Sequence, residues 1–200
     1  MISPFSYKFI CGLVRFGFFF WHPVFRVEGR ENIPEGPCVI CSNHKGLADP
    51  LWTLLALREP KMIRIMAKDE LFHVPVLKHI LKWGGVICVK RGEADLSAVR
   101  DSFRALKNGE KLLIYPEGTR VHDGEHLEGK TGAVMLANRA HCPILPMYIK
   151  RRRFPFSSMK VVLGKTYEPK SENRHPTAEE LHRLTDEMMD KIYTLGADVG

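Results

Sequence analysis

The sequence predicts a single α/β layered domain, in which helices cover a β-sheet. Short apolar runs rich in Val and Ile alternate along the chain with longer segments whose apolar residues recur at helical spacing. A chain of 200 residues with 44% hydrophobic content suits one domain with a substantial core. No internal repeat, low-complexity run or linker divides residues 24–200, so we assign them to one domain.

Residues 1–23 precede this domain, and residues 5–21 are unusually aromatic, with only Lys8 and Arg15 charged. A transmembrane helix needs about 20 predominantly apolar residues, and this stretch is shorter and interrupted. No small-residue cleavage site of a signal peptide follows it. We therefore predict an interfacial helix whose aromatic side contacts a membrane surface. The alternative is a helix that packs on the protein's own core.

From residue 25 onward, strands and helices alternate. We predict strands at residues 25–29, 38–42, 63–67, 85–89, 112–115, 144–149 and 160–163. We predict helices at residues 50–57, 75–82, 96–106, 132–140 and 178–195, and a turn at residues 33–37. Pro50 suits the first helical position, with Asp49 as the N-cap. The last helix begins with a capping box formed by Thr177 and Glu180.

The formal net charge of +7 favours anionic partners, such as phosphorylated metabolites, anionic lipid headgroups, an acidic carrier protein or nucleic acid. Nucleic acid lacks support, because no reading motif occurs and the aromatic residues cluster away from the basic run at residues 150–153. Five cysteines, an odd number, do not suggest a disulfide framework, which favours a reducing compartment. On a strand, Cys38 and Cys41 point to opposite faces, so they do not form a redox or metal pair.

A histidine and a carboxylate follow the predicted strand at residues 38–42. Four residues separate His44 from Asp49. A carboxylate this close can fix the imidazole tautomer, so that the other ring nitrogen can take a proton from a hydroxyl. Hydrolases activate a serine in this way, but the chain has no Gly-x-Ser-x-Gly elbow. The hydroxyl would then belong to a substrate, which predicts a transferase. The alternative is that Asp49 only caps a helix and His44 is structural.

Two later segments offer anion-binding groups at the ends of predicted strands, where open α/β sheets bind ligands. Arg91 follows the predicted strand at residues 85–89, and residues 115–120 come at the end of the predicted strand at residues 112–115. Arginine binds phosphate through two parallel hydrogen bonds. Glu117 can accept from hydroxyls, and Gly118 lets the backbone approach a ligand. This combination suits a phosphorylated polyol, although a solvated strand end and a plain turn remain the alternatives.

Residues 124–131 match the P-loop pattern G-x4-G-K-[ST]. A P-loop needs a strand that runs directly into its first glycine, and here the preceding predicted strand ends near Tyr115. Glu125 and Glu128 would also repel a polyphosphate. A P-loop phosphotransferase, whose nucleotide turnover would depend on Lys130, is therefore the least supported alternative.

Together these segments resemble the PlsC-type glycerolipid acyltransferases, the family of 1-acylglycerol-3-phosphate (lysophosphatidic acid) acyltransferases. Four blocks match in order: Asn43-His44-x4-Asp49, Gly85-x-Ile87-x3-Arg91, Tyr115-Pro116-Glu117-Gly118-Thr119-Arg120 and Pro143-Ile144-Leu145-Pro146. Residues 67–72 and 132–133 match the connecting text, and the resemblance covers residues 24–164. Gly46 and Val121 stand where members commonly have serine, which leaves the acceptor open among lysolipids.

The resemblance implies a mixed α/β sheet flanked by helices. It also implies direct acyl transfer from a thioester, acyl-CoA or acyl carrier protein, to 1-acylglycerol 3-phosphate, which gives phosphatidic acid without a metal or cofactor. His44 would be the base, held by Asp49. The residues implied to hold the acceptor are Arg91, Glu117, Gly118, Thr119 and Arg120. The backbone N–H groups of Lys45 and Gly46, or the side chain of Lys68, would bind the oxyanion, and Pro146 would shape the site.

The resemblance further implies a position on the cytoplasmic face of a membrane, as a peripheral or monotopic protein. That expectation agrees with the aromatic composition of residues 1–23. Two alternatives remain: an acyltransferase for another lysolipid acceptor, or a non-catalytic lipid-binding module that keeps the fold. The intact catalytic blocks argue against the non-catalytic module.

Overall fold

The computed structural model describes residues 24–59, 62–90, 95–121, 127–150, 158–171 and 176–197, together with Phe9, Gly12, Leu13, Phe16 and Gly17. The strands are β1 (Phe25–Glu28), β2 (Val39–Ser42), β3 (Ile63–Lys68), β4 (Ile87–Val89), β5 (Lys111–Ile114), β6 (Ile144–Lys150) and β7 (Met159–Leu163). The helices are α2 (Asp49–Leu57), α3 (Pro75–Trp83), α4 (Leu96–Lys107), α5 (Gly132–Ala140) and α6 (Ala178–Ala197), with the short 3₁₀ helices η1 (Arg30–Asn32) and η2 (Asp69–His73).

The strands form one sheet in the order β1-β7-β6-β2-β5-β3-β4. The five strands from β6 to β4 are parallel to one another. β7 runs antiparallel to β6, and β1 runs parallel to β7. The sheet is therefore mixed, which confirms the implied fold class. Since parallel strands end at the same edge, the loops after β2, β5, β3 and β4 gather there.

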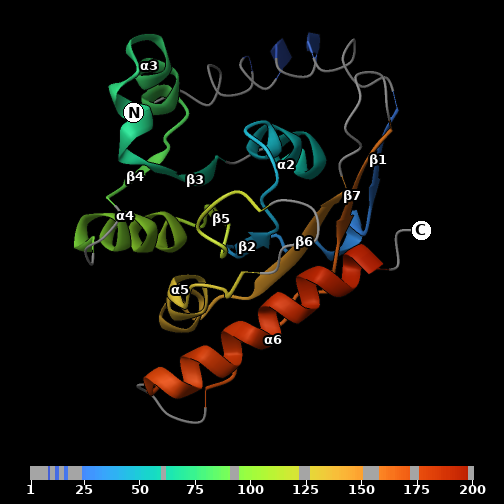
Figure 1. The fold of residues 1–200 in the computed structure, drawn as a ribbon, viewed down its shortest axis with the longest axis vertical. Helices are drawn as coiled ribbons and strands as arrows, with labels where there is room; N and C mark the ends of the chain where they lie inside the picture. The colour runs from blue at the N-terminus through green and yellow to red at the C-terminus, as the bar shows by residue number, and fades with distance from the viewer. Residues whose placement is uncertain are drawn as a thin grey trace.

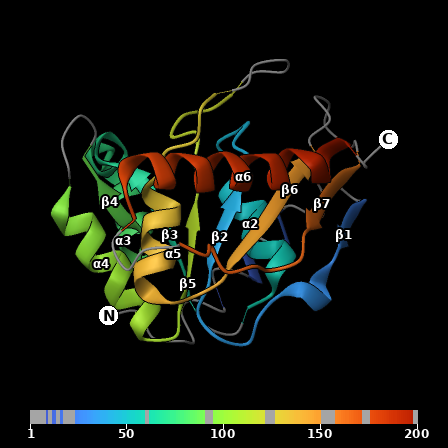
Figure 2. The ribbon, with the colours of Figure 1, turned by 90° about the horizontal axis from the view of Figure 1, so that it is seen from below.

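Helices cover both faces of the sheet (Figures 1 and 2), with α4, α5 and α6 on one side and α2 and α3 on the other. The two apolar cores follow the alternation of side chains along each strand. In β2, Val39 and Cys41 pack with residues of α5 and α6, whereas Ile40 packs with α2 residues such as Trp52. Cys38 belongs to the core beside α2, so Cys38 and Cys41 lie on opposite faces, as predicted.

The predicted elements from residue 25 onward are found, with ends displaced by at most two residues. The sequence analysis missed η1 and η2, which are too short to show a periodic pattern. Gly85 does not begin β4, because it has a φ of 60° in the turn after α3. A Cβ there would lie 2.3 Å from Nη1 of Arg64, so this position needs both the backbone freedom and the small size of glycine.

The predicted interfacial helix at residues 5–21 lies largely outside the described residues. The described members of this segment are helical, and Phe9, Leu13 and Phe16 are 60%, 57% and 69% exposed. Within the described part of the chain, no helix has the length and apolar character needed to cross a bilayer.

Candidate active site

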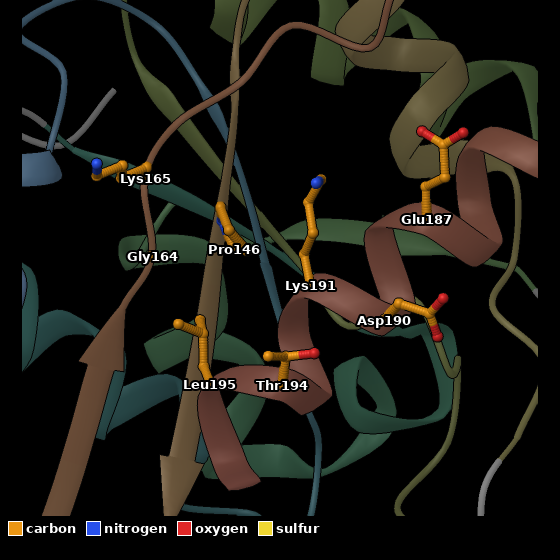
Figure 3. Close-up of a pocket in the computed structure, with 8 residues that line it drawn as sticks. All are labelled: Pro146, Gly164, Lys165, Glu187, Asp190, Lys191, Thr194 and Leu195. Atoms are coloured by element: carbon orange, nitrogen blue, oxygen red, sulfur yellow. The ribbon is translucent and has the colours of Figure 1, made fainter. Parts of the chain in front are cut away.

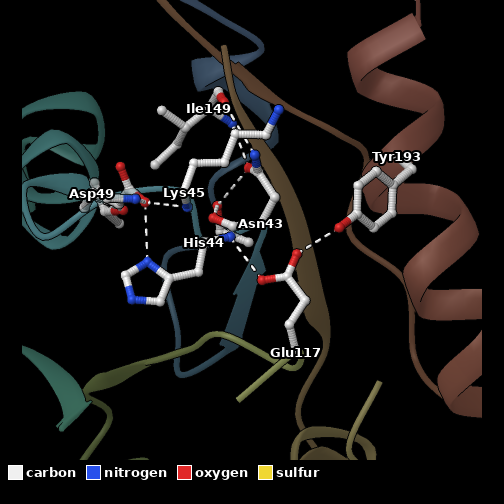
Figure 4. A network of polar contacts seen from close by, with 10 residues as sticks. Asn43, His44, Lys45, Asp49, Glu117, Ile149 and Tyr193 are labelled. Atoms are coloured by element: carbon white, nitrogen blue, oxygen red, sulfur yellow. Dashed lines mark hydrogen bonds and ion pairs between the residues drawn. The ribbon is translucent and has the colours of Figure 1, made fainter. Parts of the chain in front are cut away.

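The loop after β2 brings His44 and Asp49 together. Nδ1 of His44 lies 3.0 Å from Oδ2 of Asp49, as Figure 4 shows. The Asp49 side chain is 1% exposed and the His44 side chain 19% exposed. A buried ionised carboxylate accepts only, so Nδ1 carries the proton and Nε2 offers its lone pair. The pair has the arrangement that a general base requires.

Asp49 is not the N-cap of α2, and that prediction is wrong. The N-cap position belongs to Ala48, and Asp49 is the first residue of the helix. Oδ2 of Asp49 instead accepts the backbone N–H groups of Lys45, at 2.7 Å, and Gly46, at 2.6 Å. The carboxylate therefore holds the loop through these two hydrogen bonds and orients the imidazole at the same time. The carboxylate accepts from these loop N–H groups, which precede the helix, instead of from the first N–H groups of the helix.

This arrangement also changes the expectation for the oxyanion. The N–H groups of Lys45 and Gly46 are both engaged by Asp49, so in this structure they are not free to bind a substrate oxygen. Lys68 ends β3 and is partly buried. Because β3 lies next to β5 in the sheet, Lys68 is at the same edge as the residues that follow β5. Of the expected oxyanion groups, Lys68 is the one that Asp49 does not engage, and its role stays a prediction.

Asn43 fixes the start of the same loop. Its side chain is buried, and its Nδ2 donates to the carbonyl oxygen of Ile149 at 3.1 Å. The N–H of Ile149 donates to Oδ1 of Asn43 at 2.7 Å. The amide thus continues the β2–β6 pairing by one residue and holds His44 at the end of the strand (Figure 4). An asparagine before the histidine matters because only an amide can donate and accept in this way.

Tyr115 stacks on the His44 ring, with centroids 4.2 Å apart and planes 19° apart. Burial raises the pKa of Tyr115 well above its usual range, so the phenol stays neutral. The stacking limits rotation of the imidazole, while Asp49 fixes the direction of its Nδ1. Sequence reasoning missed this contact, because it joins the ends of two neighbouring strands that are far apart in the chain.

Glu117 is buried, and both of its carboxylate oxygens accept hydrogen bonds from the protein (Figure 4). Oε2 accepts the backbone N–H of His44 at 2.8 Å, and Oε1 accepts the hydroxyl of Tyr193 at 2.6 Å. Burial raises the pKa of Glu117, and these two hydrogen bonds partly oppose the rise. Glu117 was expected to accept hydroxyls of a substrate, but here it supports the backbone of His44. Tyr193, on α6, is a positioning residue that sequence reasoning missed.

The Tyr193→Phe variant is expected to be less stable by about 1.5 kcal/mol, because a buried carboxylate loses its short hydrogen bond. Tyr193 helps to lower the pKa of Glu117, so its loss raises that pKa further. If catalysis needs the ionised Glu117 behind His44, the acidic limb of the kcat/KM profile moves to higher pH. Denaturant unfolding and pH–rate profiles measure the two effects.

Tyr167→Phe is the matched control for Tyr193→Phe. The hydroxyl of Tyr167 is buried and has no hydrogen-bond partner among the described residues. Its removal is therefore expected to raise stability or leave it unchanged, and to leave the pH profile unchanged. Equal behaviour of the two variants would contradict the positioning role of Tyr193.

The turn formed by residues 115–121 wraps around His44. The N–H of Val121 donates to the carbonyl oxygen of His44 at 2.8 Å, and the N–H of Gly118 donates to that of Tyr115 at 3.0 Å. Gly118 has a φ of 69°, which a residue with a Cβ adopts only under strain. Thr119 and Arg120 are exposed on this turn. These groups can meet an anionic ligand beside His44, whereas Arg91 lies outside the described residues.

Pro146 lies elsewhere. It is paired with Cys41 in the interior of the sheet, and it lines a cavity of about 550 Å³ beside α6 (Figure 3). The other lining residues are Gly164, Lys165, Glu187, Asp190, Lys191, Thr194 and Leu195. His44 and Asp49 are not among them, so the structure does not bring this cavity together with the proposed base. Among the described residues, no cluster of three or more His, Cys, Asp or Glu could hold a metal ion.

Comparisons with known proteins identify the family of this chain and a similar fold. Residues 24–150 match the model of the family described as Acyltransferase. The chain is 30% identical over 125 residues to the chloroplastic 1-acyl-sn-glycerol-3-phosphate acyltransferase BAT2 of Brassica napus, which covers 60% of this chain and 36% of the relative. It is 29% identical over 176 residues to the 1-acyl-sn-glycerol-3-phosphate acyltransferase of Bacillus subtilis, with 85% of this chain and 87% of the relative covered.

A third relative is the 1-acyl-sn-glycerol-3-phosphate acyltransferase of Pseudomonas aeruginosa, 34% identical over 126 residues, with 62% of this chain and 48% of the relative covered. The chain thus spans between a third and a half of the length of the plant and Pseudomonas relatives. The fold is similar to the crystal structure of the 1-acyl-sn-glycerophosphate acyltransferase PlsC from Thermotoga maritima. The TM-score is 0.70 at 24% identity, with 96% of this chain and 80% of that chain covered.

Proposed function

Because the chain belongs to the acyltransferase family, we propose that it moves an acyl group from a thioester to the free hydroxyl of 1-acylglycerol 3-phosphate, giving phosphatidic acid. The observation that carries this proposal is the 3.0 Å contact between His44 and the buried Asp49, beside a turn that exposes Thr119 and Arg120. The acceptor follows from the names of the Brassica, Bacillus and Pseudomonas relatives.

The reaction needs one proton relay. Nε2 of His44 takes the proton of the acceptor hydroxyl as its oxygen attacks the carbonyl carbon of the thioester. Asp49 stabilises the imidazolium that forms, and Lys68 is the proposed group that faces the negative charge on the carbonyl oxygen. The tetrahedral intermediate collapses by breaking the C–S bond. The imidazolium then returns the proton to the thiolate, so no acyl-enzyme forms and no external base is consumed.

The acceptor phosphate needs cations, hydrogen-bond donors and a backbone that it can approach closely. We assign Arg120 as the cation and Thr119 as a hydroxyl donor, with Gly118 allowing close approach and Arg91, which follows β4 in the sequence, as a further cation. The donor is acyl-CoA or an acyl carrier protein, and the net charge of +7 attracts both. The proposed chemistry uses neither a metal nor a cofactor.

The acceptor and product are lipids, so we also propose that the protein works at the cytoplasmic surface of a membrane. Helix α3 supports this proposal, because none of its residues is buried. Val76, Ile80 and Trp83 are 73%, 50% and 62% exposed and share one face at helical spacing. The helix also carries Lys78 and Lys82, which suit anionic headgroups. The proposed membrane contact thus has a second part besides residues 1–23.

The double variant Ile80→Glu and Trp83→Glu is expected to bind anionic phospholipid vesicles at least tenfold more weakly. Each substitution removes an apolar side chain that would be buried in the headgroup region and adds a repelled charge. Co-sedimentation with phosphatidylglycerol vesicles measures the effect. Leu96→Glu is the control, because Leu96 is 72% exposed on α4, on the other side of the sheet. Equal vesicle binding by the double variant and the Leu96→Glu control would refute a contact through α3.

One experiment tests the proposed activity. The purified protein receives a labelled acyl thioester and a mixture of lysolipid acceptors, and mass spectrometry identifies the acylated products. Labelled phosphatidic acid is the expected main product. Another labelled phospholipid would replace the acceptor assignment, and vesicle binding without any release of free thiol would indicate the non-catalytic lipid-binding module.

A further inference from the structure

Residues 129 and 130, shortly before α5, are held from two sides. The N–H of Lys130 donates to the carbonyl oxygen of Pro116 at 2.8 Å, which attaches this segment to the turn. Gly129 packs on α6, where a Cβ would lie 2.7 Å from Cγ of Met189 and 2.8 Å from Cγ2 of Thr185. A residue larger than glycine would push the segment away from α6. The backbone of Lys130 therefore has a fixed place next to the site.

The side chain of Lys130 lies across Gly118. A Cβ at Gly118 would be 2.7 Å from Cε of Lys130 and 3.1 Å from its Nζ. The lysine side chain can thus occupy this space only because Gly118 has no side chain. Lys130 is exposed, and no carboxylate among the described residues forms an ion pair with it. Its ammonium group is therefore a cation at the surface of the turn, open to a ligand.

The turn beneath the ammonium group forms two hydrogen bonds with the backbone of His44. Glu117 accepts the N–H of His44, and Val121 donates to the carbonyl oxygen of His44. Thr119 and Arg120 leave the same turn as exposed donors. The Lys130 ammonium lies beside Gly118, the residue that precedes these two donors in the turn.

We propose that Lys130 binds the phosphate of the acceptor as a further substrate-binding residue, together with Arg120; this rests on the proposed function. Lysine acts on phosphate as a compact point charge, which complements the directional hydrogen bonds of arginine. The specificity that it adds is for lysolipids with a terminal phosphate, which carries more charge than the diester of a lysophospholipid with a headgroup.

This assignment also explains the P-loop pattern at residues 124–131. The glycine before Lys130 is required by contact with α6. Strand β5 ends at Ile114, and the described residues 115–121 that follow it form no strand. In this proposal the glycine of the pattern serves packing on α6, and its lysine binds the phosphate of a lipid rather than of a nucleotide.

Kinetics of Lys130→Met, Lys130→Arg and Lys107→Met test the proposal. We expect Lys130→Met to raise the KM for 1-acylglycerol 3-phosphate by roughly tenfold or more. Its kcat and its KM for the acyl thioester should change less than threefold. Lys130→Arg should recover most of the loss. Lys107→Met, at an exposed lysine that ends α4 before β5 begins, should behave as the unchanged protein. An unchanged acceptor KM in Lys130→Met would overturn the assignment and leave the proposed function intact.

A binding measurement separates the two proposals. Glycerol 3-phosphate carries the same phosphate, and calorimetry reports its affinity without any acyl transfer. We expect Lys130→Met to bind it roughly tenfold more weakly than the unchanged protein. That result supports Lys130 even if no thioester is turned over, whereas equal affinities would overturn its role even if acyl transfer is found.

Discussion

The His44→Ala variant is expected to lose acyl transfer by roughly a hundred- to ten-thousand-fold, the contribution of a general base. The loss should fall on kcat, because His44 acts on the proton of the attacking hydroxyl and the acceptor phosphate is held elsewhere. Stability should fall without loss of the fold, since the variant loses the hydrogen bond to Asp49 and the stacking on Tyr115, while its backbone N–H still reaches Glu117. Release of free thiol from the thioester gives the rate.

His182→Ala is the matched control, because His182 is exposed on α6 and is not part of the site. Its activity and melting temperature should equal those of the unchanged protein. Circular dichroism and thermal unfolding show whether the His44 variant keeps the fold. A folded His44→Ala protein that retains a tenth or more of the activity would exclude His44 as the base.

Replacing Asp49 by asparagine is expected to reduce acyl transfer by a similar factor, roughly a hundred- to ten-thousand-fold. Asparagine keeps the size of the side chain, and its oxygen can still accept the N–H groups of Lys45 and Gly46. His44 Nδ1 and the two N–H groups all meet the same oxygen, Oδ2, so the amide oxygen takes that place. The negative charge that stabilises the imidazolium is lost. The rate should fall while the loop keeps its shape.

Asp49→Ala separates charge from architecture. In that variant the N–H groups of Lys45 and Gly46 lose their acceptor, and an unsatisfied buried donor costs about 1–3 kcal/mol. We expect Asp49→Ala to unfold at lower denaturant concentration than Asp49→Asn, with both variants nearly inactive. If Asp49→Asn keeps full activity, the carboxylate has only a structural role and the base assignment fails.

Much of the fold was predictable because β2 and its neighbours are buried on both faces. Such strands appear as short apolar runs, and the helices between them have a different apolar spacing. The site segments were predictable for a related reason: each follows a strand directly, and parallel strands end at one edge. Membership of the acyltransferase family, inferred from four ordered blocks, is confirmed by the family match over residues 24–150.

Apart from the pairing of His44 with Asp49, the partners of the site groups were not predictable. Asp49 satisfies two rules at the sequence level, the N-cap and the acid of a His–Asp pair, and only the path of the loop decides between them. Glu117 has the chemistry of a substrate ligand, yet α6 supplies Tyr193, 76 residues later in the chain, and turns the carboxylate into a support. Pro146 belongs to a block that resembles the site, but it lines a separate cavity beside α6.

Local spacing and residue chemistry are properties of short segments, so they were enough to predict the strands, the helices and the set of reactive groups. Contacts between distant segments depend on the folded chain, as the hydrogen bond from Tyr193 to Glu117 and the stacking of Tyr115 on His44 show. These interactions act over a few ångströms, and the packing of α6 and the neighbouring strand ends sets those distances.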